Sequence, residues 1–168
     1  MPGEHTRILV VDDLPDWRLT IGGLLEDEGY EVQTAGSSED ALDLFASEQF
    51  DLAVLDVRLD ETDEENTEGL NLAAEIRRLQ SDAKIVIITG YGTQEIIRQA
   101  LEPNDVRGKL ADNYVPKTET GQLTEIVRKL LDGYFFLMAN RQAFRKPKDK
   151  GTPVKSSNAS CLKFKMIR

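Results

Sequence analysis

The sequence has little cysteine, few aromatic residues and no long apolar run. Its single cysteine, Cys161, cannot form an intramolecular disulfide. No apolar stretch approaches the roughly 20 residues that cross a bilayer. The N-terminal MPGEHTR also lacks the basic region and following apolar stretch that mark a secretory signal. These absences argue against a disulfide-stapled scaffold and against a membrane span, and they favour a cytoplasmic location.

What the chain does contain suits a folded domain with an unlike tail. It has 168 residues, of which 40% are hydrophobic and 30% charged, as in ordinary globular proteins. The charge is divided unevenly, with a net −17 over residues 1–140 and +8 over residues 141–168. We therefore expect a domain over residues 1–140 and a basic C-terminal tail over 141–168. The acidic domain disfavours nucleic-acid binding by charge alone.

Short apolar runs alternate with amphipathic stretches along the domain. Buried strands are predicted at 8–11, 32–35, 52–55 and 85–88, with a weaker one at 113–115. Apolar residues recur at helical spacing within 17–25, 41–45, 72–79, 96–101 and 123–131. Five such units predict an α/β fold, a five-stranded parallel sheet covered by helices on both faces, with a C-terminal extension.

Polar and charged residues follow four of the predicted strands. Asp12 and Asp13 follow the first strand and Asp56 follows the third, while Thr89 and Lys117 follow the fourth and fifth. The carboxyl ends of parallel strands meet at one edge, so these side chains are expected to converge there. Clustered carboxylates suit Mg²⁺, and a carboxylate can act as a nucleophile toward a phosphoryl group. A nearby hydroxyl and ammonium can bind phosphoryl oxygens.

Four segments together resemble the receiver domain of two-component response regulators. They are ILVVDDLPDWRLTIGGLLEDEGYEVQTAGSSEDALDLF, FDLAVLDVRL, IVIITGYGTQE and YVPK, within a match that runs from about Arg7 to Asp132. Five separate positions in the right order make this resemblance far more specific than one motif. It implies the flavodoxin-like, doubly wound (βα)5 fold.

The resemblance also implies a metal site. Asp13 and Asp56 would bind Mg²⁺ directly, and Asp12 would act through a water molecule. The backbone carbonyl of Arg58 would supply a further ligand. Magnesium is thus the expected cofactor.

The remaining roles concern phosphoryl transfer and its consequences. Asp56 would be the phosphoacceptor, Lys117 would contact the phosphoryl group, and Thr89 and Tyr114 would form a switch pair. The expected donor is a histidine kinase or a phosphotransfer protein. The output would be a downstream protein partner or self-association. No direct DNA-binding domain is expected, because only about thirty residues follow the fifth helix.

The sequence departs from the family pattern at three places. A long acidic stretch, VRLDETDEENTEG, separates Asp56 from the next glycine. The segment at 102–113 is longer than usual. The family's lysine normally precedes a proline, whereas here Pro116 precedes Lys117 and Thr118 follows it.

Three alternatives remain open from the residues alone. Asp12 or Asp13 could cap a helix that begins at Pro15. A pseudo-receiver would keep the fold as a protein-interaction module and signal without phosphorylation. A magnesium-dependent phosphohydrolase would need an acidic residue two positions after its nucleophile, where this chain has Arg58. We therefore expect a signalling protein that catalyses only its own phosphotransfer and dephosphorylation, not a metabolic enzyme.

Overall fold

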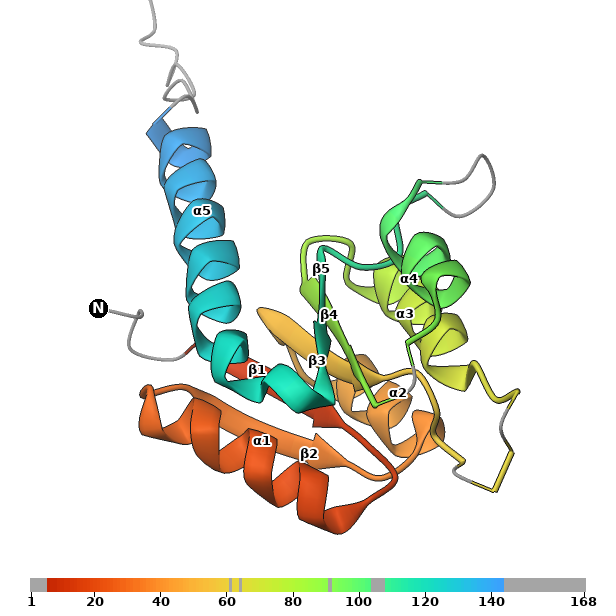
Figure 1. Ribbon diagram of the computed structural model, residues 1–168. Helices are drawn as coiled ribbons and strands as arrows, with labels where there is room; N and C mark the ends of the chain where they lie inside the picture. Colours follow the sequence, from red (N-terminus) through yellow and green to blue (C-terminus); the bar gives the residue numbers. More distant parts are fainter. Residues whose placement is uncertain (1–5, 61, 64, 91, 104–107, 144–168) are drawn as a thin grey trace, which may run out of the picture.

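The computed structural model describes residues 6–60, 62–63, 65–90, 92–103 and 108–143, with side chains described as far as Gly133. Strands and helices alternate along these residues (Figure 1). The elements are β1 (Arg7–Val11), α1 (Pro15–Asp27), β2 (Glu31–Ala35), α2 (Ser38–Ser47), β3 (Leu52–Asp56), α3 (Glu68–Leu79), β4 (Lys84–Thr89), α4 (Gln94–Leu101), β5 (Asn113–Pro116) and α5 (Leu123–Ala143), with a 3₁₀ segment at Lys117–Gln122 before α5.

The strands form one parallel sheet in the order β2-β1-β3-β4-β5. This confirms the predicted flavodoxin-like fold, and the predicted strands differ from the observed ones by one residue at some ends. The chain order reverses between β1 and β3, because β2 lies outside β1 while β4 and β5 continue beyond β3. In parallel sheets the crevice at such a reversal is the usual ligand site.

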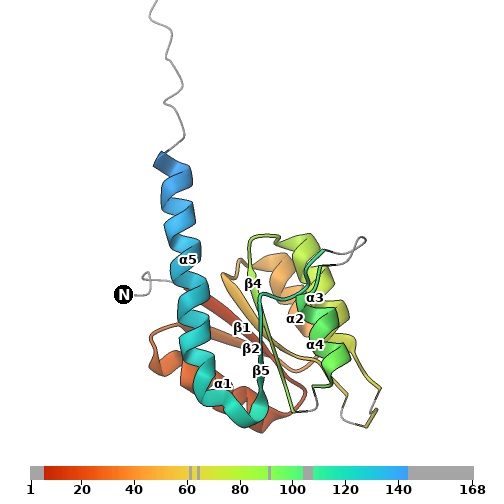
Figure 2. The same cartoon turned by 45° about the horizontal axis from the view of Figure 1, so that its top comes forward.

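Two apolar clusters hold the helices against the sheet. Alternate residues of a strand point to opposite faces, so Leu9 joins one cluster and Ile8 the other, both fully buried. One cluster contains residues from α2, α3 and α4, and the other contains residues from α1 and α5. Figure 2 shows the same division into two helical layers. Each fully buried leucine or isoleucine adds ~1.5–3 kcal/mol of hydrophobic stabilisation.

The segment at 102–113, predicted to be longer than usual, follows α4. The helix α4 has only eight residues. It returns to the sheet through backbone hydrogen bonds from Ala111 N to Ala100 O, at 2.8 Å, and from Asp112 N to Ile85 O, at 2.7 Å. Leu110 and Ala111 are buried there in the cluster beneath α4. These hydrogen bonds hold the end of the long segment in place immediately before β5, and β5 pairs with β4.

The last helix continues past the predicted domain boundary at residue 140, since α5 ends at Ala143. Most of the predicted tail, from residue 144 onward, lies outside the described residues. That division of the chain therefore stays a prediction. Among the helices of the described residues, none is both long and apolar enough to cross a membrane.

Candidate functional site

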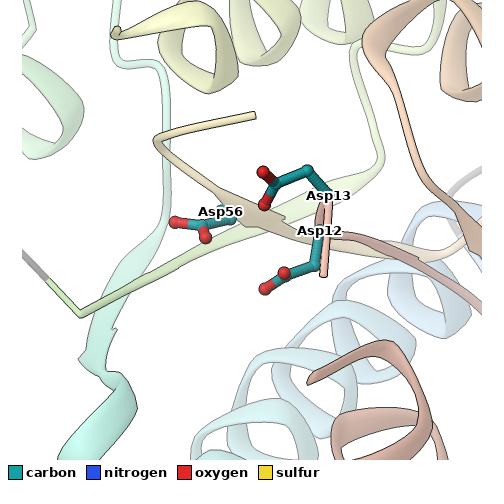
Figure 3. Close-up of side chains that lie close together, drawn as sticks. All are labelled: Asp12, Asp13 and Asp56. Carbon is teal, nitrogen blue, oxygen red and sulfur yellow. The ribbon is translucent and has the colours of Figure 1, made fainter. Parts of the chain in front are cut away.

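Three carboxylates meet where the chain order of the sheet reverses. Asp12 and Asp13 follow β1, and Asp56 is the last residue of β3. One oxygen from each lies within 4.8 Å of the others (Figure 3). Asp12 is fully buried and Asp56 is 3% exposed, whereas Asp13 is half-buried. The predicted convergence of strand ends therefore brings three like charges together in a largely desolvated place.

Local backbone contacts fix the first of these carboxylates. Asp12 N donates to Ala35 O at 3.2 Å, which ties the end of β1 to β2. Asp12 Oδ1 accepts from Leu14 N at 3.0 Å. The helix α1 begins at Pro15 with Leu14 as its capping residue and without a side-chain hydrogen bond at the cap. The alternative in which Asp12 or Asp13 caps this helix is therefore wrong, and the carboxylates face the sheet edge instead.

A glycine fixes the backbone beside Asp56. Gly69 N donates to Val57 O at 2.9 Å, so the start of α3 lies directly on the end of β3. A Cβ at Gly69 would overlap the carbonyl oxygen of Asp56. The acidic stretch after β3 thus ends at a residue that must lack a side chain, because the two backbones touch.

Lys117 brings a positive charge to the carboxylates. Its Nζ lies 2.6 Å from Asp56 Oδ2 and 2.7 Å from Asp12 Oδ2, and its side chain is 6% exposed. No cis peptide bond occurs in the described residues. The lysine therefore reaches both carboxylates directly from the end of β5, where Pro116 precedes it.

The ionisation of this group of residues is set by burial and by the close charges. Burial raises the pKa of Asp12 above its ordinary value; Lys117 opposes this shift and the charge of Asp56 adds to it. For Lys117, burial alone would lower the pKa, but the contacts with Asp12 and Asp56 outweigh it and raise the pKa. The ammonium therefore stays charged at neutral pH and partly compensates the three carboxylates.

A pocket of about 390 Å³ opens beside these residues. Trp17 forms part of its wall, and the indole ring centre lies 5.0 Å from Lys117 Nζ, within cation–π range. The sequence places Trp17 only in the apolar stripe of α1 and misses this role. Its position four residues after Asp13, one helical turn away, is the available signal. The lining residues are Trp17, Asp56, Arg58, Thr89, Gly90, Lys117 and Thr118.

The remaining predicted residues lie around the same edge. Thr89 ends β4 and is 2% exposed. Arg58 is half-buried, and its backbone N lies 3.4 Å from Asp56 Oδ1. Tyr114 lies on β5 opposite Ile87 of β4, and its hydroxyl occupies the space that a Cβ at Gly92 would need. The ligand role of the Arg58 carbonyl and the switch role of Thr89 and Tyr114 stay predictions.

The donor set fits a hard divalent cation. Magnesium binds oxygen ligands at 2.0–2.1 Å, so ligand oxygens on opposite sides of the ion lie about 4.2 Å apart. Separations within 4.8 Å require only small side-chain movements to reach this spacing. Among the described residues, no hydrogen-bond donor is well aligned with the buried Asp12 Oδ2, which Lys117 meets as an ion-pair contact. This carboxylate oxygen can therefore still accept a contact from a metal ion or from a water molecule bound to the ion.

A parallel doubly wound sheet with carboxylates and a lysine at its reversal point is the arrangement expected of a response regulator receiver. The profile of the family described as "Response regulator receiver domain" matches residues 8–128. The chain belongs to this family, as its sequence predicted. Response regulator receiver domains belong to two-component signalling systems.

Two solved structures show how closely the fold is shared. A CheY-like receiver domain protein from Methanospirillum hungatei has a TM-score of 0.66 and 31% identity, and the match covers 77% of this chain and 95% of that one. The response regulator TrrA from Thermotoga maritima has a TM-score of 0.60 and 38% identity, with 74% and 98% covered. The TrrA structure is a complex with Mg²⁺ and BeF.

A curated relative corrects one prediction. The transcriptional regulatory protein GlrR of Escherichia coli is 36% identical over 93 residues, which are 55% of this chain and 20% of that protein. The matched part of this chain thus spans about a fifth of the length of a relative named as a transcriptional regulator. The expectation of no direct DNA-binding domain rested on the short stretch after the fifth helix. It is wrong, because such receivers occur as parts of longer regulators of transcription.

Proposed function

We propose that Asp56 accepts a phosphoryl group from a histidine kinase or a phosphotransfer protein. The observation that carries this proposal is the position of the Asp56 carboxylate at the pocket. Asp12 and Asp13 lie near it as partners for a cation, and Lys117 contacts its Oδ2 directly. A nucleophile, a cation site and a fixed ammonium are the parts that phosphoryl transfer requires.

In this reaction an oxygen of Asp56 attacks the phosphorus atom. An O–P bond forms, the bond between phosphorus and the donor breaks, and its electron pair stays with the donor. Asp13 and Asp56 would hold Mg²⁺, with Asp12 acting through a water molecule, and the ion would neutralise charge on the phosphoryl oxygens. Lys117 and Thr89 both line the pocket, and in this proposal they would bind those oxygens as well.

Phosphorylation would change the charge of the sheet edge and thereby the surface beside it. A phosphoryl group carries roughly −1.5 to −2 charges at neutral pH. Thr89 ends β4, and Tyr114 lies on the adjacent strand β5. Movement of this pair toward the new group would alter the face formed by α4 and β5, which a downstream partner or a second copy would bind. The protein would act in the cytoplasm as a signalling component rather than as a metabolic enzyme.

Intact mass measurement tests the proposal. The protein is incubated with MgCl₂ and a small-molecule phosphodonor, and one phosphoryl adduct is expected. Asp56→Asn should abolish the adduct, as should removal of the metal with a chelator. Asp60→Asn is the matched control, since Asp60 is an exposed carboxylate outside the cluster, and it should keep the adduct. An adduct that survives Asp56→Asn would refute the assignment.

One observation favours the pseudo-receiver as a second candidate. Lys117 contacts two of the three carboxylates, so the site is partly compensated without any metal ion. Trp17 is the only tryptophan and lines the pocket, so its fluorescence reports on Mg²⁺ binding at this place. No fluorescence change in a Mg²⁺ titration, together with no phosphoryl adduct, would establish this second candidate.

A further inference from the structure

The residue Arg18 contacts the backbone of the aspartate pair from α1. Its Nη1 donates to Asp12 O at 2.6 Å and to Asp13 O at 3.0 Å. A Cβ at Gly36 would lie only 3.2 Å from the same nitrogen, so a glycine at the end of β2 leaves the guanidinium its space. One side chain thus holds both carbonyl groups of the residues whose carboxylates converge on the metal site.

We propose that Arg18 is a positioning residue for magnesium binding, and this inference rests on the proposed function. The bonds from Arg18 fix the peptide groups that carry Asp12 and Asp13. Fixed peptide groups hold the two carboxylates in the orientation that a cation needs, so less order is lost when the ion binds. Arg18 touches neither the phosphoryl group nor the ion in this scheme and acts only through the aspartates.

The charge of Arg18 and its positioning role predict opposite results, which makes the inference testable. A cation near the site repels Mg²⁺, so removal of the charge alone would tighten magnesium binding. Loss of positioning would weaken binding, and partners of metal ligands typically contribute 10–100-fold to metal affinity. We expect the Kd of Arg18→Met for Mg²⁺ to rise about tenfold despite the loss of a positive charge.

The structure offers a matched control in Arg77. This arginine also binds backbone carbonyls, with Nη1 at 2.6 Å from Ala83 O and Nε at 3.2 Å from Leu110 O, but at the opposite edge of the sheet. Arg77→Met should destabilise the fold and leave the Kd for Mg²⁺ unchanged. An equal rise of the Kd in both variants would mean general destabilisation and would overturn the inference.

The measurement is isothermal titration calorimetry of each 168-residue variant with MgCl₂, beside urea unfolding in a chelator. An unchanged or lower Kd in Arg18→Met would overturn the positioning role. If this variant does not fold, Arg18→Lys serves instead, because a shorter side chain keeps the charge but does not hold both carbonyls at the observed distances. A rise of about threefold supports the inference, and a wild-type Kd contradicts it. Absence of Mg²⁺ binding by the wild type would instead overturn the proposed function.

Discussion

Replacement of Lys117 by methionine tests whether its ammonium holds the acidic site together in the absence of metal. The substitution keeps an unbranched side chain that is one atom shorter and removes its charge. In the structure Nζ lies 2.6 and 2.7 Å from oxygens of Asp56 and Asp12. At an effective dielectric constant of about 20, each contact corresponds to ~6 kcal/mol of Coulomb attraction. Desolvation of the buried charges offsets much of this, and removal of one partner from a buried pair typically costs ~3–5 kcal/mol.

We therefore expect Lys117→Met to lower the free energy of unfolding by about 3 kcal/mol in metal-free buffer at neutral pH. The loss should shrink as the pH falls. Burial already raises the pKa of Asp12 in the folded state, and removal of the ammonium raises this pKa further, because the ammonium opposed the shift. A folded state with a raised carboxyl pKa binds protons more tightly than the unfolded state. Its stability therefore increases as the pH falls through the folded pKa toward the ordinary value.

Urea unfolding followed by far-UV circular dichroism measures these changes in a chelator and again in MgCl₂. Magnesium at 100 times its Kd adds ~2.7 kcal/mol to the stability of any protein that binds it only when folded. The variant should gain more than the wild type at the same concentration, because the ion no longer competes with an ammonium. A double-mutant cycle with Asp12→Asn should show a coupling of ~1–3 kcal/mol. Additive changes, or a variant as stable as the wild type in the chelator, would refute the compensating role of Lys117.

Three further substitutions test neighbouring parts of the structure. Asp13→Asn should weaken Mg²⁺ binding at least tenfold in a titration followed by tryptophan fluorescence, because a charged ligand is lost; an unchanged affinity would remove Asp13 from the site. Gly69→Ala should lower the free energy of unfolding by ~2 kcal/mol or more, measured by urea, because its Cβ would overlap the backbone at the end of β3; wild-type stability would contradict that contact. Glu95→Gln should leave the urea midpoint unchanged although Arg98 lowers the pKa of Glu95 to about 2, because both side chains of the pair are exposed to solvent; a clear shift would show that exposed pairs matter here.

The strands and the acidic site were predictable from the sequence for a simple topological reason. A strand buried on both faces must be apolar along its length, so Leu52–Leu55 reads directly as an element of a parallel sheet. The carboxyl ends of parallel strands share one edge, so Asp12 and Asp56 had to converge whatever the loops between them do. Neither inference depends on the orientation of a side chain.

The contacts that depend on side-chain direction were not predictable in the same way. Trp17 falls within an apolar helical stripe and packs against the core, and nothing in that pattern shows that its ring also lies beside an ammonium. Arg18 reads as a solvated charge on α1, because its acceptors are two backbone carbonyls that any residues would provide. The two contacts of Lys117 depend on the path of the chain after Pro116, which the packing of β5 determines. Tertiary structure supplies the information in each case.

The charges of the site bear on the proposed role of Lys117 before and after phosphorylation. The three carboxylates and the Lys117 ammonium together carry two negative charges, which one divalent cation would balance, and Arg58 also lines the pocket. In the structure the ammonium contacts the Oδ2 of Asp56, the same carboxylate that is proposed to attack phosphorus. If that carboxylate became an acyl phosphate, as proposed, its own charge would be lost and the phosphoryl oxygens would carry the negative charge instead. Lys117 would then exchange a carboxylate oxygen for a phosphoryl oxygen within the same pocket. The exchange would leave neither Lys117 nor the phosphoryl group as a buried charge without a partner, which a stable phosphorylated state requires.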